Sequence, residues 1–185
     1  MALGKLPQKQ LRNLLKDHLV LREDPETAKL IRELKQARRR GYLTPAELEK
    51  VCRWKSVRAI HHIKKNSAAR VRIATRRALV TQNECRRLEA LMSLDGVSVA
   101  MASAILTLLN PRRYGVIDIR VWQLLYAIRA VTKNPSGVGF TFTHWQQFLM
   151  IIRQFAADFH VRARDIERSL FSVHQAYQKG TLYAR

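Results

Sequence analysis

Signals for the start of an α-helix recur along the whole chain. Asp24 precedes Pro25, which joins a favoured N-cap residue to a proline at the first helical position. The segments 44–47 and 81–84 both place Thr three residues before Glu, the spacing of a capping box. No segment sustains the alternation of apolar and polar residues that a strand needs, and seven Gly and five Pro are few for a fold with many turns. The sequence therefore predicts an all-α fold.

With 185 residues, the chain has the length of one domain. Apolar residues recur at helical spacing, and we expect helices over the segments 7–20, 25–40, 45–54, 56–65, 67–79, 81–94, 99–110, 118–131, 143–159 and 162–178. Exposed polar residues weaken the pattern at the start of the chain. We therefore expect a single domain over 1–185 with a less-ordered N-terminal extension over 1–23.

Charge is the most unusual feature of the composition. The chain has 34 Lys and Arg against 14 Asp and Glu, a formal net charge of +20, and its pI is about 11.1. A surface of this kind needs a polyanionic partner, and nucleic acid is the leading candidate. An anionic membrane fits less well, because the basic residues are spread along the chain and are not gathered beside an apolar anchor.

The cysteines and the first residues of the chain indicate a cytoplasmic protein. Cys52 and Cys85 fall within expected helices, without a spacing that indicates a disulfide or a metal site. The first residues lack the apolar core of a signal peptide, and no apolar run approaches the length of a membrane span. His61 and His62 are adjacent and would point to different faces of a helix, which disfavours a shared metal. We expect a cytoplasmic monomer without metal or cofactor.

The segment 94–98 (Leu-Asp-Gly-Val-Ser) predicts a tight hairpin between two helices, within about residues 86–110. Gly96 allows backbone angles that other residues avoid, and Val97 would fill the space between the two helices. Ser98 and the N–H groups that begin the second helix would face outward, where they can bind a phosphate without reading the base sequence. An ordinary helix–turn–helix corner is the alternative for these residues.

A lone carboxylate follows the hairpin helix. Asp118 lies between apolar residues in the segment 117–121 (Ile-Asp-Ile-Arg-Val), at the start of an expected helix. Together, the hairpin and this segment resemble the helix-hairpin-helix DNA glycosylase superfamily, whose members have a Leu-Pro-Gly-Val-Gly-like turn and a Val-Asp-Thr-His-Val segment. The separation of Gly96 from Asp118 is typical of that superfamily. The resemblance covers about residues 86–125.

The resemblance implies a two-lobed helical fold that binds lesion-containing duplex DNA between its lobes and flips one nucleotide out of the stack. Asp118 would be the catalytic residue, stabilising positive charge on the sugar and orienting or deprotonating the attacking water. Members that also cleave the backbone have a lysine at the position of Ala100, so we expect no Schiff base and no lyase activity. Ser98 replaces the second glycine of the hairpin, and Asp95 replaces its proline with a negative charge.

Two further groups of residues are candidates for contacts with DNA. The first group is basic and would contact phosphates, with a solvated surface as the alternative for each member: Lys64, Lys65, Arg70, Arg76, Arg77, Arg112, Arg113 and Arg120. The second group is aromatic and could stack on a flipped base, with core packing as the favoured alternative for Trp122: Tyr114, Trp122 and Trp54.

These observations favour a monofunctional DNA N-glycosylase that removes a modified base in base-excision repair. The first alternative is a non-catalytic DNA-binding protein that has kept the hairpin, and the second is a basic helical RNA-binding protein. Asp118 distinguishes the first two. An open pocket beside its carboxylate favours the enzyme, whereas a carboxylate engaged in capping and ion pairs favours the binding protein.

Overall fold

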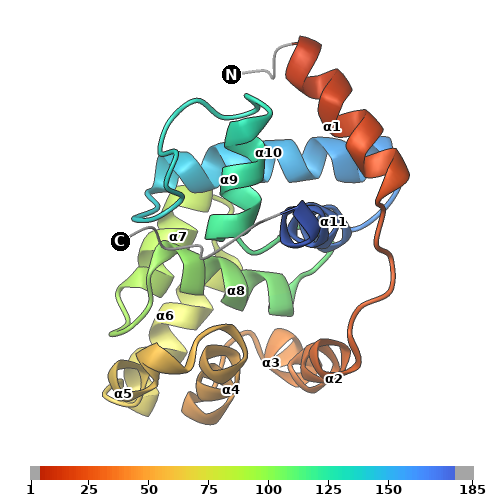
Figure 1. Cartoon of the computed structure of the whole chain (residues 1–185). Coiled ribbons are helices and arrows are strands. Elements are labelled where there is room, and N and C mark those ends of the chain that lie inside the picture. The colour runs from red at the N-terminus through yellow and green to blue at the C-terminus, as the bar shows by residue number, and fades with distance from the viewer. Residues whose placement is uncertain (1–4, 178–185) are drawn as a thin grey trace. The chain divides into compact units, whose positions relative to one another are not determined.

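The computed structural model describes residues 5–177, and these residues form helices and loops without any strand. The prediction of an all-α fold is confirmed. The chain divides into two compact units (Figure 1). Unit 1 holds the described residues of Met1–Arg22 and Pro111–Arg185, and unit 2 is Glu23–Asn110. The hairpin therefore belongs to unit 2 and Asp118 to unit 1.

Unit 2 is built around one buried helix. Its elements are α2 (Pro25–Glu33), α3 (Lys35–Arg40), α4 (Pro45–Lys55), the short 3-10 helix η1 (Val57–Ala59), α5 (Ile60–Ile63), α6 (Ala68–Val80), α7 (Glu84–Met92) and α8 (Val99–Leu109). Helix α8 contacts α2, α3, α4 and α7 (Figure 1). Residues 101–109 of α8 are all buried, so this helix forms the centre of the unit.

Unit 1 consists of α1 (Lys5–Asp17), α9 (Ile119–Ala127), α10 (Phe142–Asp158) and α11 (Ala163–Tyr177). Helix α11 contacts α1, α9 and α10, and large aromatic side chains fill the core: Trp122, Trp145, Phe148 and Phe155. Leu11 and Leu15 of α1 are fully buried. Most of the expected N-terminal extension is therefore an ordered helix, because Leu11 and Leu15 join the core. Residues 1–4 lie outside the described part of the chain.

Local capping signals account for two of the helix starts. The Asp24 side chain accepts a hydrogen bond from the Thr27 N–H at 2.8 Å, at the N-terminus of α2. In α4 the Thr44 hydroxyl accepts from the Glu47 N–H at 3.3 Å, and the Glu47 carboxylate accepts from the Thr44 N–H at 2.7 Å. The capping box predicted at 44–47 is confirmed.

The capping box predicted at 81–84 is wrong. Helix α7 begins at Glu84, and Asn83 is its N-cap, accepting from the Arg86 N–H at 3.0 Å. The buried Arg87 guanidinium binds the carbonyl oxygens of Ala78 at 2.9 Å and Thr81 at 2.8 Å. These bonds hold Thr81 outside the helix.

Several expected helices are interrupted or shorter than their sequence pattern, among them the two over 25–40 and 118–131. The buried Leu34 separates α2 from α3, within the segment expected as one helix over 25–40. Helix α9 ends at Ala127, before the expected end at 131, and Arg129 has a φ of +58°. A left-handed residue ends a helix, because its backbone angles do not continue the α-helical turn.

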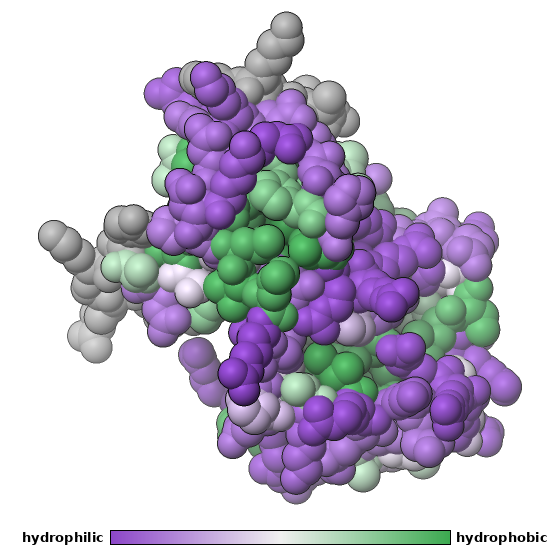
Figure 2. All heavy atoms as spheres, turned by 90° about the vertical axis from the view of Figure 1, so that its right-hand side faces the viewer, coloured by the Kyte–Doolittle hydropathy of each residue, from purple (hydrophilic) through white to green (hydrophobic). Residues whose placement is uncertain are grey.

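Hydrophilic residues cover most of the face shown in Figure 2, and apolar surface gathers in separate patches. No helix among residues 5–177 is both long and apolar enough to cross a membrane. The described residues also contain no group of three or more His, Cys, Asp or Glu side chains that could hold a metal ion.

Candidate nucleic-acid interface

The predicted hairpin connects α7 to α8 in unit 2. Helix α7 ends at Met92, and the Val97 N–H donates to the Leu94 carbonyl at 3.2 Å to close the turn. Val97 is buried, as expected for a residue that fills the space between two helices. Ser98 is exposed and caps α8, since its hydroxyl accepts from the Met101 N–H at 3.3 Å.

Gly96 is required for two reasons, of which the sequence indicated one. Its φ of +80° lies in the left-handed region, which costs a residue with a side chain about 1–2 kcal/mol. A Cβ added at Gly96 would also lie 2.9 Å from the Cβ of His62 and 3.2 Å from the Ile63 backbone nitrogen. The turn therefore packs directly against α5, which the sequence did not indicate.

Asn66 holds the hairpin in place, a role that the sequence did not indicate. The Asp95 N–H donates to Asn66 Oδ1 at 2.9 Å, while Asn66 Nδ2 donates to the Asp95 carbonyl at 3.0 Å and the Ile63 carbonyl at 2.9 Å. Asn66 is buried, and each of its side-chain polar atoms has a partner. Its position just before the N-cap of α6 is the only signal in the sequence, and many loop residues share it.

Arg70 offsets the negative charge that Asp95 brings to the turn. Its Nη1 lies 3.0 Å from Asp95 Oδ2, and its Nη2 donates to the Ser93 carbonyl at 2.8 Å. Both charged side chains are about half exposed, so the pair stabilises the fold by no more than about 1 kcal/mol. The Arg70 guanidinium is thus engaged with the hairpin itself, and its contact with phosphate stays a prediction.

The start of α8 has the donors that an anion needs. Ser98 Oγ accepts from Met101, and the Ser98 carbonyl accepts from the Ala102 N–H at 2.8 Å. The N–H groups of Val99 and Ala100 belong to the first turn, where an α-helix has no internal acceptor for them. The partial positive charge of the helix N-terminus adds to these donors.

The other basic candidates divide between the two units. Lys64, Lys65, Arg76 and Arg77 are exposed in unit 2, and Lys64 Nζ lies 4.0 Å from a Glu49 carboxylate oxygen. Arg112, Arg113 and Arg120 belong to unit 1. Only the first four share a unit with the hairpin, so they are the candidates that can extend its surface.

Asp118 is the N-cap of α9 in unit 1, as its position at the start of an expected helix predicted. Its carboxylate accepts a hydrogen bond from the Val121 N–H at 3.1 Å. The side chain is half-buried and has further interactions besides this cap. The Asp118 carboxylate is thus engaged in capping, the arrangement that we expect of a DNA-binding protein without catalysis.

Helix α11 brings a buried carboxyl close to Asp118. Glu167 is 2% exposed and forms an ion pair with Arg164, and a Cβ added at Gly115 would lie 2.7 Å from the Glu167 Cβ. Burial raises the pKa of the Glu167 carboxyl above its ordinary value, against the lowering effect of Arg164, and the negative charge of Asp118 raises it further. The surroundings of Asp118 therefore include a second carboxyl, whose pKa is raised in the folded chain.

His174 and Arg120 also belong to the surroundings of Asp118. Burial and the positive charge of Arg120 lower the pKa of His174, while Asp118 raises it by a smaller amount. The Arg120 guanidinium lies over the Phe171 ring, 5.5 Å from its centroid. This stacking gives the Arg120 guanidinium a packing role within unit 1, and its contact with phosphate stays a prediction. Glu167 and His174 come from a helix far along the chain, so the sequence around Asp118 did not indicate either of them.

The three aromatic base-pocket candidates have packing roles, as the favoured alternative for Trp122 predicted. Trp122 is fully buried, and its Nε1 donates to the Asn134 carbonyl at 2.9 Å. Tyr114 is buried and lies parallel to Trp145, with ring centroids 6.2 Å apart. Trp54 Nε1 donates to Thr27 Oγ1 at 2.7 Å, which joins α4 to α2. The rings of Tyr114 and Trp122 are thus part of the core of unit 1. Trp54 instead connects two helices of unit 2.

Comparison of the chain with family models, curated proteins and solved structures gives no match. Function is therefore inferred from the residues and geometry of each unit. In unit 2 these are the hairpin and its supports, and in unit 1 they are Asp118 and the side chains around it.

Proposed function

We propose that the protein binds the sugar–phosphate backbone of duplex DNA through the hairpin of unit 2. One observation carries this proposal: the turn between α7 and α8 places the exposed Ser98 at the N-terminus of α8. Asn66 and the close approach of Gly96 to α5 fix the turn from within the unit. A rigid set of donors binds an anion at a smaller entropic cost than a mobile loop.

The charges around the hairpin support a phosphate as the ligand. Arg70 pairs with Asp95, which offsets the one carboxylate of the turn. Lys64, Lys65 and Arg76 are exposed in the same unit and can contact neighbouring phosphates. Contacts of this kind fix the position of a protein on DNA but carry no sequence information, so we expect little preference among base sequences.

Ser98 offers a matched pair of variants to test the proposal. Both Asp and Asn replace Ser well as N-cap residues, so Ser98→Asp and Ser98→Asn should both keep the fold. Ser98→Asp adds a negative charge where we place the phosphate, and we expect its affinity for a duplex oligonucleotide to fall about tenfold or more. Ser98→Asn should bind close to the wild-type affinity. Fluorescence anisotropy over a salt series measures both effects, and wild-type binding should weaken steeply with salt.

Two outcomes contradict duplex DNA binding through the hairpin. Equal affinities of Ser98→Asp and Ser98→Asn for the duplex would show that the hairpin is not part of the DNA interface. A strong preference for single-stranded RNA over duplex DNA would favour the RNA-binding alternative.

Asp118 supports a second function, hydrolysis of an N-glycosidic bond. The observation that favours it is a half-buried carboxylate, fixed at a helix N-terminus and close to Glu167. A carboxylate in a partly desolvated place acts strongly on a nearby cation, such as the sugar as its base departs. Ala100 has no amine for a Schiff base, so the attacking group would be water.

The substitution Asp118→Asn tests this second function. Asn is as good an N-cap as Asp, so the variant should keep α9 while it loses the charge. We expect excision of a modified base to fall by roughly 10²–10⁴, while binding to duplex DNA is kept. The assay is a panel of duplexes with single alkylated, deaminated or oxidised bases, followed by alkali to cleave abasic sites. Excision by the variant at the wild-type rate would exclude Asp118 from the mechanism.

A further inference from the structure

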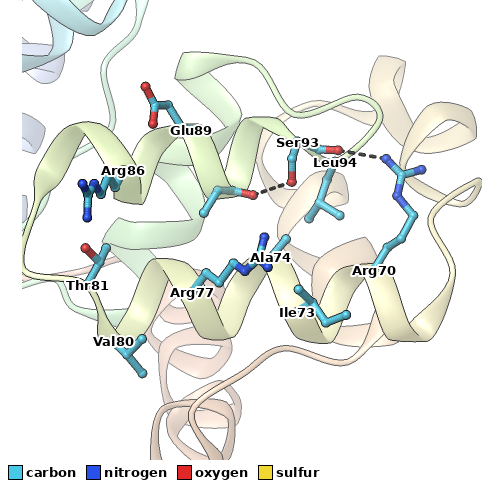
Figure 3. A pocket seen from close by; sticks show the side chains of 11 residues that line it. Arg70, Ile73, Ala74, Arg77, Val80, Thr81, Arg86, Glu89, Ser93 and Leu94 are labelled. Atoms are coloured by element: carbon cyan, nitrogen blue, oxygen red, sulfur yellow. Dashed lines mark hydrogen bonds between the residues drawn. The ribbon is translucent and has the colours of Figure 1, made fainter.

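A groove runs between α6 and α7 in unit 2, beside the hairpin, and Ser98 and the first turn of α8 are not part of its lining. Its cavity volume is about 590 Å³ (Figure 3). The lining from α6 includes Arg70, Ile73, Arg77 and Val80, and the lining from α7 includes Arg86 and Ala90. We call this surface the α6/α7 groove.

The α6 side of the groove is one continuous face of the helix. Residues 70, 73, 77 and 80 are three or four positions apart, so they lie above one another along α6 (Figure 3). Ile73 is 49% exposed and Val80 is 67% exposed. Two large apolar side chains thus lie in solvent on one ridge, and covering them would remove apolar area from water.

Arginines surround this apolar ridge. Arg77 lies along the ridge and Arg86 lies across the groove on α7 (Figure 3). Within residues 5–177, neither guanidinium has an ion-pair or hydrogen-bond partner. Glu89 is the single carboxylate among the described lining residues. The groove therefore combines an apolar ridge on α6 with the unpaired positive charges of Arg77 and Arg86.

We propose that the α6/α7 groove binds an acidic amphipathic helix of a partner protein. Apolar side chains of such a helix, at positions i, i+3, i+4 and i+7, would cover Ile73 and Val80. Its carboxylates would pair with Arg77 and Arg86, in the bidentate geometry that arginine favours. This inference does not depend on DNA binding by the hairpin.

The groove fits nucleic acid less well than it fits such a helix. No aromatic side chain lines it on which a base could stack. A phosphate backbone laid along the groove would cover Ile73 and Val80 with charged groups, which gain nothing from an apolar surface. The apolar ridge is thus explained by a protein ligand and not by a nucleic acid.

Synthetic peptides and the full chain test the proposal. The probe is a peptide of about 15 residues, four helical turns, with Leu on one face and Glu on both flanks of that face. One control peptide has the same composition in scrambled order, and a second has Lys in place of Glu. We expect saturable binding of the probe alone in calorimetry, with amide chemical-shift changes confined to α6 and α7.

Two exposed valines provide the matched variants. Val80→Asp places a carboxylate on the ridge and should weaken peptide binding about tenfold or more. Val57 is 59% exposed in η1 of the same unit and does not line the groove, so Val57→Asp should leave binding unchanged. Both substitutions fall on solvent-exposed side chains and should keep the fold.

Three results would overturn the inference. The first is no saturable binding of the probe, and the second is equal binding by the Val80→Asp and Val57→Asp variants. The third is binding of a duplex oligonucleotide that changes the chemical shifts of the same α6 and α7 amides and is weakened by Val80→Asp. That result would assign the groove to nucleic acid.

Discussion

Helices α8 and α11, which lie at the centres of units 2 and 1, are buried through different chemistry. Residues 101–109 of α8 are apolar or small, and its two hydroxyls are satisfied within the helix: Ser103 donates to the Ala100 carbonyl at 2.8 Å, and Thr107 to the Ser103 carbonyl at 2.7 Å. Helix α11 buries charged side chains beside apolar ones, among them Arg164, Asp165 and Glu167.

Each of these three buried charged side chains of α11 has a partner. Arg164 pairs with Glu167, and Arg162 Nη2 lies 2.6 Å from Asp165 Oδ1. The Ser169 hydroxyl donates to the Asp165 carbonyl at 2.7 Å and accepts from the Val20 N–H at 2.9 Å, which ties α11 to the segment after α1. An apolar central helix tolerates small changes in packing, whereas a helix with buried charges depends on each partner. The contrast teaches that unit 1, which holds Asp118, is the unit in which single polar substitutions do most damage.

The largest expected effect is on the buried ion pair of α11. Glu167→Ala leaves Arg164 charged and buried without its carboxylate, and it should lower the free energy of unfolding by about 3–5 kcal/mol. Hydrogen exchange read by mass spectrometry can measure the loss separately for each unit, and unit 1 should show it.

Asp158 provides the control for this prediction. It pairs with Arg12 in the same unit, but both side chains are partly exposed, so Asp158→Ala should cost less than about 1 kcal/mol. Similar losses for the two substitutions would contradict the view that burial makes the α11 pair critical.

A substitution that creates a cavity beside α8 is the matching test in unit 2. Ile105 is fully buried, and Ile105→Ala should destabilise unit 2 by about 2–5 kcal/mol through lost burial and the cavity that remains. Urea unfolding followed by circular dichroism gives the free energy. The exposed Val57→Ala serves as the control and should stay within about 0.5 kcal/mol of the wild type. A small loss for Ile105→Ala would mean that α8 is not the packing centre of its unit.

The smallest expected effect is a pH dependence of stability from Glu167. Its pKa is raised in the folded chain above the ordinary value of 4.5, so between 4.5 and the folded pKa the folded state binds more protons than the unfolded state. The contribution of Glu167 to stability is therefore fully present below about pH 4.5 and is lost as pH rises through the folded pKa.

Glu167→Gln removes this titration while it keeps a side chain of similar size. The free energy of unfolding of the variant, relative to the wild type, should therefore increase as pH rises from about 4.5 towards neutral. Chemical unfolding at several pH values measures the difference. A difference that stays constant or decreases with pH would show that the folded chain favours the ionised form.

The sequence alone determined the all-α fold, the hairpin at 94–98 and the place of Asp118 at the start of a helix. These features depend on groups within about four residues of each other: a capping side chain, a glycine with positive φ, or a carboxylate beside free N–H groups. Local patterns predicted them for that reason, although Asn83 took the capping position expected for Thr81.

Only the tertiary structure decided what surrounds these features. Asn66 clamps the hairpin, Arg70 neutralises Asp95, and Glu167 and His174 come from α11 to the surroundings of Asp118. Packing also buried Tyr114, a candidate for stacking on a base, and brought α6 and α7 together to form the groove. Each of these outcomes joins residues distant along the chain. Their contact energy depends on where whole helices pack, and no pattern of neighbouring residues encodes it.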